Sequence, residues 1–288
     1  MSDQLRLLAV HAHADDETIT MGATMALYAQ RGARVGNVCC TDGQLATIVD
    51  PELAAQEAEV RPRLGELRRQ ELRDACDILG VADLYFLGYG DSGMAGASTN
   101  QDPGAFWKAD LDEVTGRLVT LFREFRPHVV VTYDGNGAYG HPDHIQAHRG
   151  TLLAFEAAHL GKMYPDAGEP WRVSKLYYTA FPRSEARKAV ELAQMAGMPS
   201  PFGDAPIDEL EFVADDDVVT TGVSAGDTMS LKLAALRAHR SQIGPDFPYL
   251  AVPEELVRQY FDVEHFSLAV SRVPTTIPET DLFAGVRA

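Results

Sequence analysis

The sequence predicts an α/β fold: a Rossmann-like, doubly wound, mostly parallel sheet with helices on both faces and a C-terminal α+β extension. Two observations carry this prediction. Short apolar segments alternate with segments of helical period along the first 180 residues. The apolar segment 128–133 lacks polar alternation, as expected for a strand that is buried on both faces.

Each expected element in this region is delimited by a local signal. Gly32 and Gly80 end two helices, because glycine readily adopts the left-handed conformation found after a helix. In 106–125 the apolar residues step by three and four, which is the helical period. The expected strands are 5–10, 33–40, 83–88, 128–133 and 174–180, and the expected helices are 17–30, 64–79, 106–125 and 142–160.

After about residue 181 the periodicity weakens, but no linker, repeat or low-complexity segment separates the rest of the chain. We therefore expect a single domain over residues 1–288, with a core of about 1–180 and an extension of about 181–288. The elements expected in the extension are helices near 184–196 and 226–240, strands within 208–221 and a strand near 264–270.

Composition excludes several classes of function. The chain is 45% hydrophobic and 23% charged, which is typical of a globular protein, and its net charge of −17 argues against a nucleic-acid partner. No apolar run approaches the roughly 18 residues that span a membrane. The N-terminal segment has an acidic residue too early in the sequence for a signal peptide. Three cysteines, an odd number within expected elements, favour a reduced, cytoplasmic chain. Whether copies associate as a homo-oligomer is left open.

Titratable residues gather directly after two of the expected strands. The segment 11–17, HAHADDE, follows the first strand, and 133–144, YDGNGAYGHPDH, follows the fourth. In open parallel sheets, ligands collect beyond the carboxyl ends of the strands. Although roughly 130 residues separate the two clusters, we expect them to converge on one site.

Together the clusters contain the ligand types of a catalytic zinc site, which takes about three protein ligands and keeps a position open for water. We predict that His13, Asp16 and one histidine of the segment 141–144 hold one Zn²⁺ per chain; Fe²⁺ would suit the same ligands. Asp15 is positioned to accept a proton from water. A protonated His141 could stabilise the oxyanion or donate to the leaving nitrogen.

Each cluster also has a simpler interpretation. The acids at 15–17 could merely cap a helix, and the segment 141–144 alone could be a turn with solvated histidines. We expect His11 to be hydrogen-bonded at a buried strand end and His148 to support or pack against the site. The two clusters together favour a shared metal site.

These motifs, in this order, resemble the LmbE-like, or GlcNAc-PI de-N-acetylase, family of zinc amide hydrolases, whose patterns are HPDDE and HxxH. The resemblance covers nearly the whole chain. Segments such as DSGMAG (91–96) and ETDLFAG (279–285) look like the mycothiol branch, which contains an N-acetylglucosaminyl-inositol deacetylase and a mycothiol S-conjugate amidase.

The resemblance implies a role for individual residues of this sequence. The zinc ligands fall on His13, Asp16 and His144. The general base falls on Asp15, and the histidine that stabilises the oxyanion falls on His141.

Four further residues take supporting roles by the same resemblance. Asp143 lies beside His141 to orient it, and Tyr139 matches a tyrosine that polarises the substrate carbonyl. Arg68 and Asp91 match positions that bind inositol and sugar hydroxyls, which suits a guanidinium and a carboxylate. From the residues alone, Arg68 could instead form a helix-surface ion pair, and Asp91 could form a turn.

One residue departs from the family pattern: Ala14 stands in place of the proline. Alanine lacks the fixed φ of proline and so loosens the loop, but no ligand is lost, and we expect activity to survive. Nearer the C-terminus, four polar residues could either close the pocket or decorate a helix. They are Lys232, Arg237, His239 and Gln242.

The expected function is zinc-dependent hydrolysis of an N-acetyl amide on a glucosamine-containing small molecule, such as an N-acetylglucosaminyl-inositol. An alternative is cleavage of a thiol conjugate, as catalysed by the mycothiol S-conjugate amidase. Residues 166–178 resemble that amidase more than they resemble the deacetylase. A remote alternative is a non-hydrolytic, receiver-like or nucleotide-binding module with Mg²⁺ on Asp15 and Asp16. That module would leave 141–144 unused, and the chain's Gly-rich segment lacks the Lys-Ser/Thr of a P-loop.

Overall fold

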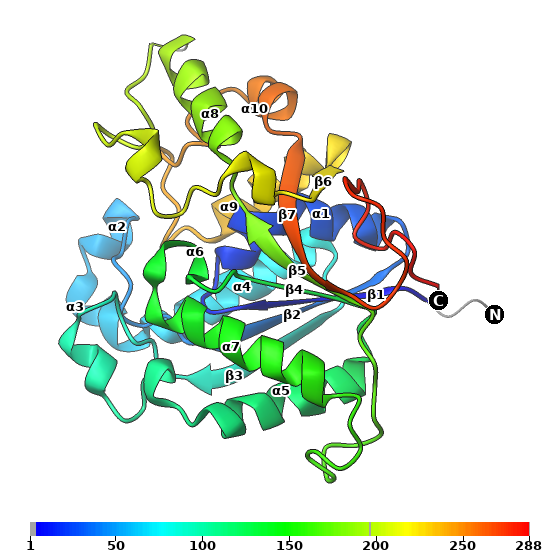
Figure 1. Ribbon diagram of the computed structural model, residues 1–288. Coiled ribbons are helices and arrows are strands. Elements are labelled where there is room, and N and C mark those ends of the chain that lie inside the picture. The colour runs from blue at the N-terminus through cyan, green and yellow to red at the C-terminus, as the bar shows by residue number, and fades with distance from the viewer. Residues whose placement is uncertain (1–3, 196, 288) are drawn as a thin grey trace.

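The computed structural model describes residues 4–195 and 197–287 and shows a seven-stranded sheet with helices on both faces (Figure 1). The strand order is β3-β2-β1-β4-β5-β7-β6. The first five strands in this order are parallel, and β7 runs antiparallel to both β5 and β6. The predicted mostly parallel α/β sheet is therefore confirmed. The strands are β1 (Arg6–His11), β2 (Arg34–Thr41), β3 (Asp83–Tyr89), β4 (Val129–Thr132), β5 (Lys175–Ala180), β6 (Thr221–Ser224) and β7 (Val263–Ser271).

The helices of the parallel half follow the predicted order. The longer ones are α1 (Asp16–Gln30), α4 (Leu64–Leu79), α5 (Leu111–Phe125) and α7 (Pro142–Ala157), and the extension adds α8 (Arg183–Met195) and α9 (Met229–Ala238). Shorter ones are α2 (Pro51–Ala54), α3 (Glu57–Val60), α6 (Gly137–Gly140) and α10 (Glu254–Tyr260). Within the part of the chain that the structure describes, no helix has the length and apolar character needed to cross a membrane.

Three predicted elements are wrong in extent, and one of them is the helix predicted over 142–160, which ends at Ala157. The helix predicted over 106–125 begins only at Leu111, because the Asp110 carboxylate caps α5 by accepting hydrogen bonds from two backbone amides of its first turn. Within 208–221, where strands were predicted, the chain forms 3₁₀ turns, and β6 begins only at Thr221. β6 forms because it pairs with β7, which is distant in the sequence. Its own residues show no strand periodicity that would predict it. Residue 196, the predicted end of α8, lies outside the described residues.

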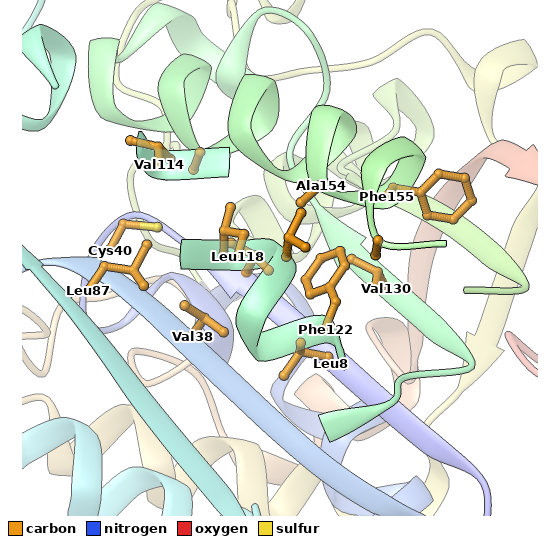
Figure 2. Close-up of a cluster of buried hydrophobic side chains, with 14 of the residues drawn as sticks. Leu8, Val38, Cys40, Leu87, Val114, Leu118, Phe122, Val130, Ala154 and Phe155 are labelled. Atoms are coloured by element: carbon orange, nitrogen blue, oxygen red, sulfur yellow. The ribbon is translucent and has the colours of Figure 1, made fainter. Parts of the chain in front are cut away.

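Both faces of the sheet are covered, so successive residues of β1 enter different cores. Leu8 lies in one buried cluster with Phe122 of α5 and Phe155 of α7 (Figure 2), whereas Leu7 lies in another with Met25 of α1 on the opposite face. These side chains are fully buried. Burial of each contributes about 1.5–3 kcal/mol, which fixes the strand between its two helical layers.

The strand order reverses between β1 and β4, which pair directly from Leu7–Ala9 to Val129–Val131. Beyond their carboxyl ends the chain turns into α1 on one face and into α6 and α7 on the other. Such a switch point opens a crevice in which ligands bind. The two predicted clusters of titratable residues follow these two strands.

Candidate metal centre and active site

Two loops at the switch point bring distant residues into contact. The first joins β1 to α1, and the second ends at Pro142, which occupies the first turn of α7, where proline is well accommodated. His141 caps α7, because its Nδ1 accepts a hydrogen bond from the backbone N–H of Asp143 at 3.2 Å. The rings of His13 and His144 lie with their centroids 5.1 Å apart.

Three donor atoms converge between these loops: Nδ1 of His13, Nε2 of His144 and Oδ2 of Asp16. The two nitrogens are 3.1 Å apart, and the oxygen is 3.4 Å from His13 and 3.5 Å from His144. Atoms that bind a tetrahedral ion at about 2.0–2.2 Å lie about 3.3–3.6 Å from one another. Two of the three separations lie in this range and the nitrogen–nitrogen distance is slightly shorter, so the three atoms, called the donor triangle below, are placed to hold a single divalent cation.

Further contacts hold the triangle in place. The Tyr133 hydroxyl donates to Oδ2 of Asp16 at 2.6 Å and accepts from the backbone N–H of Ala12 at 2.7 Å. The backbone N–H of His13 also donates to Asp16, at 2.9 Å. Burial lowers the pKa of His144 to about 3, which leaves its ring neutral and able to ligate. Burial also acts to lower the pKa of His13, but hydrogen bonds to Asp143 and Asp16 outweigh it and raise that pKa to about 10, so metal binding at Nδ1 would displace a proton. Sequence reasoning missed Tyr133, whose only signal is its place at the start of the second cluster.

The carboxylate of Asp143 contacts His13, in addition to the predicted role of Asp143 in orienting His141, which stays a prediction. Its carboxylate accepts a hydrogen bond from Nε2 of His13 at 3.2 Å and further bonds from the hydroxyl and the backbone N–H of Ser92. An imidazole ligand commonly donates its second N–H to a carboxylate, which fixes the ring. Asp143 thus orients His13 through its carboxylate, and its backbone N–H also bonds to Nδ1 of His141.

His141 lies next to the triangle, with a ring nitrogen within 4.8 Å of those of His13 and His144. Because its Nδ1 accepts the amide of Asp143, the neutral ring carries its hydrogen on Nε2. Burial, followed by the charge of nearby His13, lowers the pKa of His141. These contacts favour a neutral ring with its hydrogen on Nε2, and the role of a protonated His141 stays a prediction.

Asp15 has a backbone φ of +112°, which is unfavourable for a residue with a side chain. Two contacts hold this conformation: its N–H donates to Oε2 of Glu17 at 3.0 Å, and its carboxylate lies 3.2 Å from the guanidinium of Arg68. Burial raises the pKa of Asp15 to about 6, with Arg68 acting in the opposite direction. A carboxylate with that pKa can both accept and return a proton near neutral pH.

Arg68 is buried beneath the loop and is not part of a helix-surface ion pair. It donates to the carbonyl of Gly43 at 2.7 Å and to that of Ala14 at 2.6 Å, and so fixes the loop at the position where the family has proline. Gly43 has a φ of +59°, and a Cβ there would lie 2.1 Å from Nη1 of Arg68, so only glycine fits. Nε of Arg68 has no hydrogen-bond partner among the described residues.

Glu17 and His239 form a fully buried pair beneath the same loop, which sequence reasoning did not anticipate. Nε2 of His239 and Oε1 of Glu17 are 2.9 Å apart, while Oε2 accepts the N–H of Asp15. The end of α9 is thereby tied to the loop that carries Asp15. The only sequence signal was a histidine whose role stayed open.

Lys232, also left open, stabilises a break in α1. At Met21 the backbone leaves the helical region, with φ −148° and ψ 20°. Nζ of Lys232 donates to the carbonyl of Ile19 at 2.8 Å and to Glu264 at 2.6 Å, and Glu264 accepts the N–H of Thr24 at 2.7 Å. The ion pair thus satisfies backbone groups that the break exposes.

Two histidines lie near the site but outside the triangle. His11 is buried and forms hydrogen bonds with Asn37 at 3.3 Å and Thr20 at 3.2 Å. His148 bonds through Nδ1 to the carbonyl of Tyr133 at 3.0 Å. Of the remaining polar residues, Arg237 is exposed and Gln242 borders the cavity described next.

A cavity of about 1190 Å³ opens over the centre. Asp91 accepts hydrogen bonds in its wall from the N–H groups of Gly93 at 2.8 Å and Leu45 at 3.3 Å. The ring of Tyr139 lies 5.0 Å from that of His144, and its hydroxyl has no hydrogen bond within the described residues. Eight of the nine predicted site residues border the cavity, namely His13, Asp15, Asp16, Arg68, Asp91, Tyr139, His141 and His144.

The chain is similar to known proteins over nearly its whole length. Residues 8–155 match the family described as GlcNAc-PI de-N-acetylase. The chain is 46% identical to the 1D-myo-inositol 2-acetamido-2-deoxy-alpha-D-glucopyranoside deacetylase of Thermobispora bispora, over 99% of this chain and 100% of that protein.

Two solved structures share the fold. The N,N'-diacetylchitobiose deacetylase from Pyrococcus horikoshii has a TM-score of 0.61 and 23% identity, over 92% of this chain and 84% of its own. The 4-carboxy-2-hydroxymuconate hydratase GalB from Pseudomonas putida KT2440 has a TM-score of 0.64 and 19% identity, over 95% and 99%. One fold thus carries a deacetylase and a hydratase, so these likenesses support the fold alone.

Proposed function

The chain belongs to the GlcNAc-PI de-N-acetylase family, and we propose that it hydrolyses the acetamide of N-acetylglucosaminyl-inositol, yielding acetate and the free amine. The observation that carries this proposal is the donor triangle with Asp15 and His141 beside it in one cavity. The 46% identical relative is named for this reaction.

His13, Asp16 and His144 would hold one cation, for which Zn²⁺ is our first choice and Fe²⁺ the second, because two imidazoles and a carboxylate suit both. When bound, the cation polarises the scissile carbonyl and lowers the pKa of the attacking water. Mg²⁺ prefers oxygen ligands, so the two nitrogens of the triangle do not support the Mg²⁺ module considered from the sequence.

The side chains around the triangle supply the proton transfers. Asp15 accepts a proton from the attacking water and returns it to the amine nitrogen as the carbon–nitrogen bond breaks. Nε2–H of His141 and the unpaired hydroxyl of Tyr139 donate hydrogen bonds to the carbonyl oxygen, where negative charge develops. Arg68 holds the Asp15 carboxylate in place, and Arg68 and Asp91, which both border the cavity, would bind substrate hydroxyls.

An assay of amine release tests the proposed function. Zinc-loaded protein is expected to release equal amounts of acetate and free amine from N-acetylglucosaminyl-inositol. Chelation should abolish the release, and added Zn²⁺ should restore it. N-acetylglucosamine, which lacks the inositol, serves as the comparison substrate in the same assay. Absence of free amine from both substrates, with one zinc bound per chain, would contradict the proposal.

A further inference from the structure

Asp15, the proposed general base, is held from two sides by contacts outside the donor triangle. It stands at the N-cap of α1 with a φ of +112°, yet its side chain makes no capping hydrogen bond. Its backbone N–H donates to Oε2 of Glu17 at 3.0 Å, and its Oδ2 accepts from Arg68 at 3.2 Å. A residue with a side chain keeps such a φ only where its surroundings impose it. The direction of the carboxylate therefore depends on what fixes Glu17 and Arg68.

Glu17 is fixed by a residue of the C-terminal extension. Its Oε1 accepts hydrogen bonds from Nε2 of His239 at 2.9 Å and from the hydroxyl of Thr18. Both the Glu17 carboxylate and the His239 ring are fully buried, and His239 is the residue at which α9 ends. One carboxylate thus links the backbone of Asp15 to an imidazole that lies 222 residues from Glu17 in the sequence.

The turn after α9 is also anchored to the helix that carries Arg68. The backbone N–H and the hydroxyl of Ser241 donate to the two carboxylate oxygens of Glu71 at 2.9 Å and 2.6 Å. Glu71 lies three residues along α4 from Arg68, and residues with this spacing are neighbours on a helix. The contacts therefore close into a ring, which we call the positioning circuit: Asp15, Glu17, His239, Ser241, Glu71 and Arg68.

The hydrogen bonds of His239 point to a role beyond stability. Whether its ring is neutral or protonated, Nε2 donates to Glu17 and Nδ1 is left buried without a hydrogen-bond partner among the described residues. A buried polar atom without a partner destabilises a fold. Such atoms are rare in folded proteins and are expected chiefly at functional or strained sites.

We propose that His239 is a positioning residue for the general base: through Glu17 it holds the backbone of Asp15 in the conformation from which the carboxylate takes the proton of the attacking water. His239 does not border the cavity, so it acts through Asp15 and not on the substrate. The inference rests on the proposed function, because it requires Asp15 to be the base. It makes the C-terminal extension part of the catalytic apparatus.

Two polar variants of His239 test this role. Glutamine places an amide N–H where Nε2 of the imidazole lies, whereas asparagine places its amide near Nδ1, away from Glu17. A base displaced by about 1 Å can slow a reaction about 10²-fold. His239→Asn is therefore expected to lower kcat by about 10–100-fold, with KM within about twofold of the unaltered protein and one zinc per chain. His239→Gln should recover most of the loss.

His159→Leu, at a histidine outside the cavity, is the matched control and should leave kcat, KM and zinc content unchanged. Unaltered kcat in His239→Asn would overturn the proposal. Ser241→Ala breaks one bond of the positioning circuit with a smaller change of structure, and should lower kcat less than His239→Asn does, again without a change in KM.

A double-mutant cycle separates positioning from a general loss of structure. In zinc-loaded Asp15→Asn protein the base is already absent, so adding His239→Asn or Ser241→Ala should lower the residual kcat by no more than about twofold. A merely structural role would lower it by the same factor as in the unaltered protein. That additive result would overturn the proposal and leave the proposed function intact.

Crystal structures of the zinc-loaded variants provide an arm without turnover. In His239→Asn the Asp15 carboxylate is expected to shift by about 1 Å or more relative to the donor triangle, and in His239→Gln it should stay in place. An Asp15 carboxylate that does not move in His239→Asn would overturn the proposal even if no acetamide were hydrolysed. Absence of hydrolysis by the unaltered protein would itself contradict the proposed function.

Discussion

Asp15→Asn is expected to lower kcat/KM for the acetamide substrate by about 10²–10⁴-fold, the range that general base catalysis commonly contributes. Asparagine keeps the size of the side chain and its contact with Arg68, but its amide cannot take a proton from water. The metal content should stay at one ion per chain, because Asp15 is not part of the donor triangle. Amine release and metal analysis on the same preparation measure both quantities.

The matched control is Asp77→Asn, on the exposed face of α4, which should leave both quantities unchanged. If Asp15→Asn kept full activity, another group would have to accept the proton. If it lost the metal together with the activity, Asp15 would be a ligand and the assignment of the base would be wrong.

Replacing His13 with alanine is expected to abolish both metal retention and activity. The substitution removes one ligand of three and leaves the Asp143 carboxylate buried without its hydrogen bond from the ring. Metal affinity should fall by more than the roughly 10–100-fold that is lost when an outer partner of a ligand is removed. Zinc analysis after dialysis, together with amine release, would show the loss.

His148→Ala provides the comparison for His13→Ala. His148 lies one turn along α7 from His144, bonds to the backbone carbonyl of Tyr133 and packs against the ring of Tyr178. It should therefore retain one zinc per chain and most of the activity. Equal zinc loss in the two variants would mean that the donor triangle is not the site that binds the ion.

The sequence was sufficient to locate the site because its signals are local. Each cluster of acids and histidines follows a strand that its own apolar residues define, and parallel strands place their carboxyl ends at one edge. His13 and His144 meet for that reason, 3.1 Å apart at their facing nitrogens. Ala14, which removes the family proline, does not leave the loop free, since Arg68 bonds to its carbonyl.

The supporting contacts could not be predicted, because each joins segments with no sequence relation. His239 reaches Glu17 from the end of α9, and Asp143 bonds to His13 across the two loops. Likewise, β6 has no strand period of its own and exists through its pairing with β7. Such contacts depend on how helices and sheet edges pack together, and local sequence patterns do not determine that packing.

The central claim is that His13, Asp16 and His144 together hold one catalytic cation. Anomalous diffraction at the zinc edge, from crystals of zinc-loaded protein, tests it most directly. The expected result is a single peak per chain, in contact with Nδ1 of His13, Oδ2 of Asp16 and Nε2 of His144. A peak placed instead among the neighbouring group His13, Asp91, His141 and Asp143, whose donor atoms also lie within 4.8 Å of one another, would contradict the claim.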